Sequence, residues 1–411
     1  MASSPTYEDR IYELHIFQGM APSVQIARLK LPAVSGTGEP GAGEEIGSLP
    51  TESCFLVDVE ALRGALADFR EAFPRCDIFY ALKANSDPLV VATLADLGCG
   101  FEAASWGEIA LLAGLGVGPQ QIIYGTAVKP PAEVARAFSY GVDRYAADSR
   151  EELVMLSATA PGSRVFLRVT ADDSGSVYHL NRKFGAALRD AAPLLLLARE
   201  LGLVPWGLSF NVGSQASRKT AWAESLAALS PSMESLQEHD IKLGIINIGG
   251  GFPEAYAGDH PWSLCEIAAP LFQAHARLPY QPGLVIEPGR RLVARSTALI
   301  ATVFARIERE NGPWLFLDCG VYNGLFEALR CQGDTKYEVS RIGSSSAPLL
   351  CFALAGPTGD SLDVLSEGSE LPADTGVGDQ LRFECAGAYT LALASSFNGF
   401  APPPVRMTGR G

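Results

Sequence analysis

Residues 77–105 read DIFYALKANSDPLVVATLADLGCGFEAAS and contain one strand–helix unit followed by the start of the next. DIFYALKAN is a short apolar run with aromatic residues, a pattern that predicts a buried strand. DPLVVATLADLG begins at Asp87 and Pro88, a favoured helix start, and ends at Gly98, a favoured helix stop. CGFEAAS then has a strand pattern again. This order predicts two parallel strands joined by a crossover helix.

The same rhythm continues as far as residue 290. Further strand patterns occur at QIIYGT, RYAADS, RVFLRVT, PWGLSFNVG, GIINIGGG and GLVIEPGR, and helical patterns separate most of them. Together with DIFYALKAN and CGFEAAS they give eight strand candidates, if the earlier run CFLVDV is set aside. Eight such units predict a TIM (β/α)8 barrel, and a doubly wound open sheet is the competing α/β interpretation.

Beyond residue 290 the pattern changes. ARSTALIATVFARIERE, PWLFLDCGVY, LLCFALAG and DQLRFECAGAYTLAL predict strands with turns and few helices, hence a mostly β domain. Residues 34–50 are rich in Gly, Pro and Glu and predict a loop. The predicted organisation is an N-terminal segment at 1–52 that contributes to the β domain, a cofactor-binding barrel at 53–290 and a C-terminal β domain at 291–411.

Composition narrows the class of protein. The 411 residues are 47% hydrophobic and 19% charged, which favours a folded chain of about two domains, and the net charge of −14 disfavours nucleic acid or anionic membrane as a partner. The eight cysteines and five histidines show no metal-binding spacing, so no metal is expected and the cysteines are interpreted as reduced core residues. No signal peptide or membrane span is expected, which predicts a cytoplasmic location.

Polar residues stand at the ends of the predicted barrel strands. In a TIM barrel the chemistry lies at the C-terminal strand ends. These ends carry Lys83, Glu102, Arg168, Asn211 with Ser214, the glycines Gly249, Gly250 and Gly251, and the EPGR segment from Glu287 to Arg290.

A lysine, a carboxylate and a glycine-rich loop suggest pyridoxal phosphate as the cofactor. Lys83 would form a Schiff base, and Glu287 would keep the pyridine nitrogen protonated. The glycine-rich loop would bind the phosphate together with Arg290, since outward-turned backbone amides attract anions. A carboxylate on the ring nitrogen strengthens the electron sink and favours decarboxylation over racemisation.

These residues resemble a known family, the fold-type III pyridoxal-phosphate decarboxylases, which include ornithine, diaminopimelate and related arginine decarboxylases. The resemblance runs from about residue 53 to residue 400, nearest the ornithine branch. It rests on YALKAN, FEAAS, FLRVTADDS, RKFG, SFNVGSQ, IGGGFP, EPGR, GPTGDSLD and GAYTLALASSFNG, in the family's order. It implies a TIM barrel with a C-terminal β domain, an amino-acid substrate and a homodimer whose active sites are shared across the interface.

The resemblance also implies roles for individual residues. Lys83 would be the Schiff-base lysine and Glu287 the ring-nitrogen partner, with Glu102 near the lysine and Arg168 behind the cofactor. The residues implied at the phosphate are Ser214, Gly250, Gly251, Gly289, Arg290 and Tyr389. Asp360 would reach across the dimer to the substrate's distal amine, and Tyr322 and Asp334 are the other substrate-binding candidates.

Three positions depart from the family pattern. Asn211 stands where the family has a histidine stacked on the cofactor ring, and Gly359 stands where it has a cysteine thought to protonate the alpha carbon. Near the family's amine-binding aspartate this chain has Cys331 and Gln332, with Asp334 slightly displaced.

The predicted function is therefore decarboxylation of an amino acid, of the basic ornithine or lysine type, or of an amino-acid derivative. The resemblance implies an external aldimine and a quinonoid, with a protonation step altered at Asn211 and Gly359. The alternatives are decarboxylation-dependent transamination or other chemistry of the same cofactor, and a non-catalytic regulator resembling a decarboxylase. Asp360 has an alternative role as a structural residue that bonds a turn.

Overall fold

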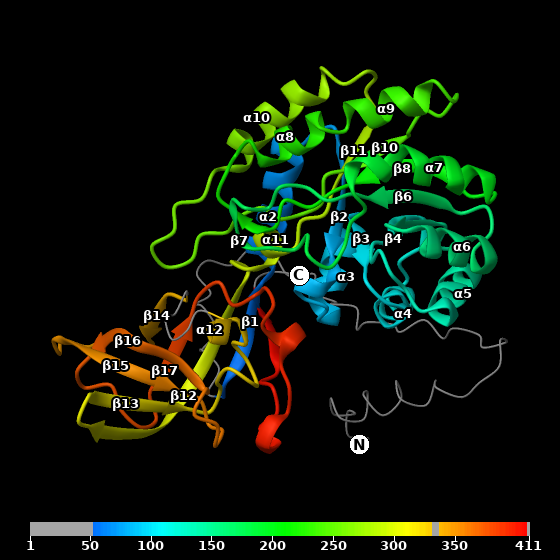
Figure 1. The fold of residues 1–411 in the computed structure, drawn as a ribbon. Helices are drawn as coiled ribbons and strands as arrows, with labels where there is room; N and C mark the ends of the chain where they lie inside the picture. The colour runs from blue at the N-terminus through cyan, green and yellow to red at the C-terminus, as the bar shows by residue number, and fades with distance from the viewer. Residues whose placement is uncertain (1–51, 331–336, 409–411) are drawn as a thin grey trace, which may run out of the picture.

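The structure is a computed structural model that describes residues 52–330 and 337–408. Eight strands close into a parallel barrel in the order β10-β11-β2-β3-β4-β5-β6-β8 (Figure 1). The pairing of β11 with β2 closes the ring, which confirms the TIM barrel and excludes the open sheet. The barrel strands are β2 (Cys76–Ala81), β3 (Gly100–Ala103), β4 (Ile122–Tyr124), β5 (Arg144–Ala147), β6 (Arg164–Arg168), β8 (Val204–Ser209), β10 (Ile245–Asn247) and β11 (Gly283–Ile286).

Helices surround this barrel on the outside (Figure 1). Their ends follow local signals: the Asp87 side chain accepts the Leu89 N–H, Ser149 accepts the Glu152 N–H, and Gly141 ends its helix at φ 109°. The helices are α2 (Val59–Ala72), α3 (Pro88–Asp96), α4 (Trp106–Gly114), α5 (Pro131–Tyr140), α6 (Arg150–Thr159), α7 (Ala191–Glu200), α8 (Ala221–Ala227), α9 (Ser230–Gln237) and α10 (Leu264–His275).

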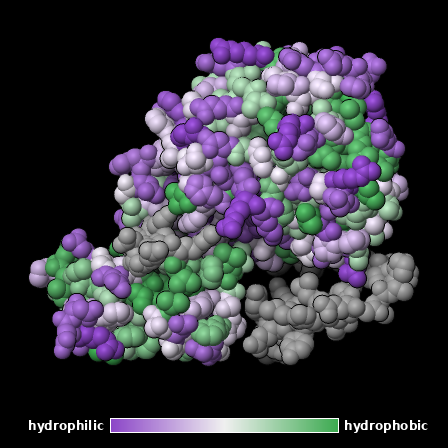
Figure 2. Space-filling view, viewed as in Figure 1, coloured by the Kyte–Doolittle hydropathy of each residue, from purple (hydrophilic) through white to green (hydrophobic). Residues whose placement is uncertain are grey.

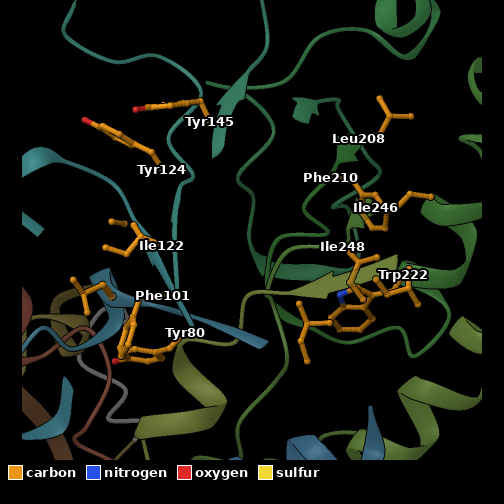
Figure 3. Close-up of a cluster of buried hydrophobic side chains, with 14 of the residues drawn as sticks. Tyr80, Phe101, Ile122, Tyr124, Tyr145, Leu208, Phe210, Trp222, Ile246 and Ile248 are labelled. Carbon is orange, nitrogen blue, oxygen red and sulfur yellow. The ribbon is translucent and has the colours of Figure 1, made fainter. Parts of the chain in front are cut away.

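The barrel core is apolar in two layers. Phe79, Ile123 and Phe166 belong to a small cluster contributed by strands around the barrel. A larger cluster packs strands against helices, and Figure 3 shows part of it, including Tyr80, Phe101 and Trp222. Burying one such side chain stabilises the fold by about 1.5–3 kcal/mol. This packing fixes the strand ends that carry the polar residues.

A second sheet of eight strands is mostly antiparallel and lies beside the barrel (Figure 1). Its strands are β1 (Cys54–Asp58), β12 (Thr297–Arg309), β13 (Gly312–Leu317), β14 (Val339–Arg341), β15 (Leu349–Ala355), β16 (Val364–Pro372), β17 (Gln380–Phe383) and β18 (Val405–Thr408). The predicted run DQLRFECAGAYTLAL is a strand only in its first part, because Cys385 and Tyr389 both adopt φ 57° and the chain turns.

Strand β1 differs from the predicted domain boundary. The sequence interpretation assigned residues from 53 onward to the barrel, but β1 pairs with β12 antiparallel and with β18 parallel in the second sheet. The closed barrel offers no free edge, and Phe55 of β1 packs in the core of the second sheet. Residues 1–51, expected to contribute to the β domain, lie outside the described residues.

Four short elements complete the fold near the site. They are β7 (Ser176–Tyr178), which pairs antiparallel with β9 (Ser214–Ala216), and the one-turn helices α11 (Arg290–Val293) and α12 (Glu327–Arg330). Within residues 52–330 and 337–408, no helix combines the length and apolarity needed to cross a bilayer. The seven cysteines of these ranges are free thiols; Cys54, Cys99 and Cys319 are buried, whereas Cys265 and Cys351 are exposed and so are not core residues.

Candidate active site

Neighbouring barrel strands bring Lys83, Glu102 and Glu287 to one end of the barrel. Lys83 lies in a 3-10 turn (Leu82–Ala84) directly after β2, Glu102 lies in β3, and Glu287 follows β11. Because β2 pairs with both β3 and β11 in parallel, the three side chains arise from adjacent strand ends. We call this group, with Arg168 and Arg290, the barrel mouth.

The Lys83 amine donates a hydrogen bond to Glu102 Oε2 at 2.8 Å. Half of the Lys83 side-chain surface is exposed, whereas Glu102 is almost fully buried. A β-carbon on Gly125 would collide with the Glu102 carboxylate, so this glycine makes room for the acid. Burial would lower the pKa of Lys83, but the nearby Glu102, Tyr389 and Glu287 outweigh it and raise that pKa. The amine is therefore protonated, and the Glu102 carboxylate stabilises its positive charge through this hydrogen bond.

Glu287 is a carboxylate with a perturbed pKa. Burial and the negative charge of Glu102 raise its pKa to about 7, and Lys83, Asn247 and Arg168 oppose that rise. Asn247 Nδ2 donates to Glu287 Oε1 at 2.5 Å. The sequence reasoning did not identify Asn247, although it is the polar residue between the buried strand and the glycine-rich loop.

Arg168, the last residue of β6, adds a cation to the barrel mouth. Burial lowers its pKa, and the charges of Glu287, Glu102 and Asp148 oppose that change. Its guanidinium lies 5.4 Å from the centre of the Phe184 ring. Its Nε is buried and has no hydrogen-bond partner among the residues that the structure describes. A buried donor of this kind is commonly satisfied by a bound group.

The three glycines after β10 form a tight loop that larger residues could not adopt. Gly249 and Gly251 have φ 69° and 91°. A β-carbon on Gly250 would collide with the Glu287 carbonyl oxygen, and one on Gly251 with that of Gly213. The loop is thereby held against the barrel mouth.

Tyr389 reaches the same place from the C-terminal part of the chain. Its N–H donates to Ala84 O at 2.8 Å, next to Lys83, and a β-carbon on Gly289 would lie 3.5 Å from its hydroxyl. Its φ of 57° is uncommon for a residue with a side chain, and such conformations concentrate at ligand sites. Tyr389, Gly289 and the turn that carries Lys83 therefore meet.

Arg290 is buried and paired. Its Nη2 donates to Glu327 Oε1 at 2.7 Å and its Nη1 to Glu327 Oε2 and to the Tyr256 hydroxyl. The guanidinium also lies 4.9 Å from the centre of the Tyr389 ring. Burial would lower the pKa of Arg290, but the bonds to Glu327 and the nearby Tyr256 outweigh it, so that pKa is raised. Its Nε has no hydrogen-bond partner within the described ranges.

Glu327 was not found by the sequence reasoning. It lies 37 residues after Arg290 in the segment GVYNGLFEALR, and no local pattern distinguishes it from an ordinary helical glutamate.

Asn211 and Ser214 follow β8 in a fixed turn. The Asn211 side-chain oxygen accepts the Gly213 N–H at 2.9 Å, and Asn181 donates to the Asn211 carbonyl at 2.7 Å. Ser214 begins β9 and lies opposite Tyr178 of β7. The Asn211 carboxamide thus shapes the loop that leads to Ser214.

The predicted substrate residues lie in the second sheet's loops, and we call Tyr322, Gly359 and Asp360 the β-domain cluster. The Tyr322 hydroxyl donates to Asp360 Oδ2 at 2.8 Å, and the Leu362 N–H donates to Asp360 Oδ1 at 3.0 Å. These two donors, the Leu362 N–H foremost, lower the pKa of Asp360. Within the described parts of the chain, no hydrogen bond or ion pair joins this cluster to Lys83 or Glu287. Asp334 lies outside the described residues.

Gly359 is exposed, and its N–H donates to Asn398 Oδ1 at 3.0 Å. A β-carbon there would come no closer than 3.8 Å to any other group. The position therefore accepts a side chain but has none.

The barrel mouth fits pyridoxal phosphate on its own geometry. The amine of Lys83 and the carboxylate of Glu287 could serve the aldehyde and the ring nitrogen. The glycine loop, Gly289 and Tyr389 would bind the phosphate, and the buried Nε of Arg290, which has no partner in the described residues, could donate to it. The described residues contain no group of three side chains suited to hold a metal ion.

Comparisons with known proteins agree with this geometry. Residues 59–294 match the family model "Pyridoxal-dependent decarboxylase, pyridoxal binding domain". The ornithine decarboxylase of Schizosaccharomyces pombe is 33% identical over 85% of this chain and 82% of that protein. Antizyme inhibitor 2 of Xenopus laevis is 35% identical over 86% of this chain and 80% of that protein.

Solved structures give the same result. A lysine/ornithine decarboxylase from Vibrio vulnificus, solved with cadaverine, has a TM-score of 0.80 and 30% identity, and the match covers 87% of this chain and 95% of that one. With the closed barrel, the mixed sheet and the lysine at the end of β2, these matches show that the chain belongs to the pyridoxal-dependent decarboxylases of fold type III.

Proposed function

We propose that this enzyme removes the alpha-carboxyl group of a basic amino acid of the ornithine or lysine class, with pyridoxal phosphate as its cofactor. The observation that carries the proposal is the adjacency of Lys83, Glu102 and Glu287 at neighbouring strand ends, with Lys83 and Glu102 in direct contact. When bound, the cofactor supplies an electron sink for the electron pair that carbon dioxide leaves behind.

The residues of the barrel mouth would hold the cofactor at both ends. Lys83 would bind the aldehyde through its amine, with Glu102 beside it, and Glu287, as an anion, would keep the ring nitrogen protonated. Arg168 would lie behind the ring. The phosphate would be bound by Ser214, Gly249, Gly250, Gly251, Gly289, Tyr389 and the Nε of Arg290.

The β-domain cluster would bind the distal ammonium of the substrate through Asp360. Tyr322 would hold the Asp360 carboxylate in place by its hydrogen bond. Since no bond connects this cluster to the barrel mouth within the described chain, we propose that it serves the barrel mouth of a second copy in a homodimer. The exposed apolar side chains of Leu362, Phe397 and Phe400 beside it support the proposal that a second copy covers this surface. Figure 2 shows hydrophobic surface gathered over the second sheet.

The return of a proton to the alpha carbon would differ from the family pattern. Asn211 has no acidic proton, and Gly359 has no side chain. Lys83 would carry the proton instead, since its amine is protonated and lies in the barrel mouth against Glu102. If the proton instead reached the cofactor's aldehyde carbon, the product would be a carbonyl compound, as in decarboxylation-dependent transamination.

A panel of basic and neutral amino acids, incubated with the cofactor-loaded protein in heavy water, tests the proposal. We expect carbon dioxide release from ornithine or lysine and an amine that carries one deuterium at the former alpha carbon. Lys83→Ala should abolish both the release and the covalent attachment of the cofactor. A carbonyl product favours transamination, and cofactor binding without any turnover favours the non-catalytic regulator, to which the match with antizyme inhibitor 2 lends a precedent.

Gly359→Cys tests the protonation step. The space at this position accepts a β-carbon, so the variant should fold normally. A positioned general acid is typically worth about 10²–10⁴-fold, and part of that gain should appear as faster amine formation or a higher ratio of amine to carbonyl product. No change in either quantity would mean that Gly359 does not face the reacting carbon.

A further inference from the structure

Asn247, the last residue of β10, is 1% exposed and makes two side-chain hydrogen bonds. Its Nδ2 donates to Glu287 Oε1 at 2.5 Å, and its Oδ1 accepts the Gly249 N–H at 2.9 Å. Because a backbone N–H can only donate, the oxygen of the carboxamide must face Gly249 and the NH2 group must face Glu287. The orientation of the amide is therefore fixed by its surroundings.

The two bonds join opposite ends of the proposed cofactor site. Glu287 is the ring-nitrogen partner, and Gly249 opens the loop that would bind the phosphate. The backbone adds a third link, since the Glu287 N–H donates to Gly249 O at 2.8 Å. We propose that Asn247 is a positioning residue that favours the anionic form of the Glu287 carboxylate and sets its place relative to the phosphate loop.

A carboxamide suits this task better than an acid of the same shape. An aspartate could still accept the Gly249 N–H, but its second oxygen would face Glu287 without a proton to donate. Two carboxylates in contact must share a proton, which would neutralise one of them at neutral pH. Asn247 avoids this and still satisfies both neighbours.

Several other groups also act on Glu287. Glu102 disfavours its ionisation, as burial does, whereas Lys83 and Arg168 favour it together with Asn247. The Asn247 bond is therefore one of three interactions that lower the pKa of Glu287 against burial and Glu102, which raise it. This inference rests on the proposed function, since it assigns a role toward pyridoxal phosphate.

The test uses the apoprotein and needs no turnover. The titration of Glu287 can be followed by carbon-13 NMR of labelled glutamate, with Glu287→Gln identifying its signal. In wild type the Glu287 signal should titrate with a midpoint near pH 7, because the pKa of Glu287 is raised to about 7. Asn247→Ala and Asn247→Asp should each move the midpoint upward by about one pH unit or more, because the donor is lost.

Asn323→Asp is the matched control. Asn323 is equally buried, and its Oδ1 accepts the Gly320 N–H at 2.8 Å, but it lies in the second sheet's loops and does not touch Glu287. This variant should leave the Glu287 midpoint unchanged. An equal shift in Asn323→Asp would show that general destabilisation moves the signal and would overturn the assignment.

A double variant covers the case in which Asn247→Asp folds poorly. Asn247→Asp with Glu287→Gln exchanges the acid and the amide, so one donor and one acceptor again face each other. Its urea midpoint should return toward wild type, whereas two unconnected residues would give additive losses. Additive losses would contradict the proposal.

Failure of this inference can be told from failure of the proposed function. If wild type binds pyridoxal phosphate and releases carbon dioxide but the Asn247 variants leave the Glu287 titration unchanged, only the positioning role is wrong. If wild type binds no cofactor, both the positioning role of Asn247 and the proposed function are wrong. In the loaded protein, the nitrogen-15 shift of the cofactor ring should move toward the unprotonated form in Asn247→Asp and stay unchanged in Asn323→Asp.

Discussion

The barrel mouth and the β-domain cluster both contain acidic side chains, but in opposite surroundings. In the barrel mouth, Glu102 and Arg290 are buried and each is paired with an opposite charge. In the cluster, Tyr322 and Asp360 are partly exposed, and Asp360 is bonded by the Tyr322 hydroxyl and the Leu362 N–H, with no ion pair to a cation of the described residues. The charges of the barrel mouth are paired within one chain, whereas the cluster is partly exposed, in keeping with the proposal that it serves the site of a second copy.

The difference follows from what each region must hold. Adjacent strand ends bring several charges together, and such charges survive burial only if each is paired or hydrogen-bonded. The result is a rigid frame for a bound cofactor. The cluster is held by fewer interactions, because the Asp360 carboxylate accepts hydrogen bonds only from the Leu362 N–H and the Tyr322 hydroxyl among the described residues. Perturbing the two regions should therefore affect different properties, stability in the first and substrate use in the second.

The largest expected effect is in the barrel mouth. Glu327→Ala would leave the buried guanidinium of Arg290 without its counter-charge, and breaking such a pair costs about 3–5 kcal/mol of folding free energy. Urea unfolding of the apoprotein measures the loss. Glu308→Ala, which removes the exposed partner of Arg306, is the control and should change little. Equal losses of stability in the two variants would contradict the proposed distinction between buried, paired charges and exposed charges.

The next effect belongs to the cluster. Asp360→Asn should leave the unfolding midpoint nearly unchanged but lower kcat/KM for ornithine or lysine by about 10- to 100-fold, since a charge-assisted hydrogen bond to the distal ammonium is lost. A substrate that lacks the distal amine should be used equally well by wild type and variant. If both substrates were affected alike, Asp360 would be the structural residue of the alternative interpretation.

The sequence predicted the barrel and most of the barrel mouth, because both depend on local patterns. Strand–helix alternation located all eight barrel strands, and the rule that chemistry lies at strand ends located Lys83, Glu102 and Glu287. Asn247 and Glu327 escaped because their partners lie 40 and 37 residues away in the chain. Contacts at such separations depend on how the strands and domains pack, which no periodicity records.

The placement of β1 shows the same limit. An apolar run before a helix looks like the first strand of a barrel or like the edge of another sheet, and the local pattern is the same in both cases. Its pairing with β12 and β18, both of which follow the whole barrel in the sequence, decides the matter. The residues of the cluster were found by resemblance, which also implied that Asp360 lies apart from Lys83 of its own chain; no local pattern in the sequence indicates either point.

The smallest expected effect, counted per pH unit, is a pH dependence of stability that differs in sign between the two regions. The pKa of Glu287 is raised from 4.5 to about 7, so the folded apoprotein holds this proton more tightly than the unfolded chain, and stability relative to Glu287→Gln should fall as pH rises from 4.5 to about 7. The pKa of Asp360 is lowered, so stability relative to Asp360→Asn should fall as pH decreases through the folded value below 3.8. One proton changes the folding equilibrium by at most about tenfold per pH unit. Urea midpoints of wild type, Glu287→Gln and Asp360→Asn, measured across pH, give the change in stability with pH for each carboxylate. Changes of equal sign would contradict the difference between the surroundings of Glu287 and Asp360.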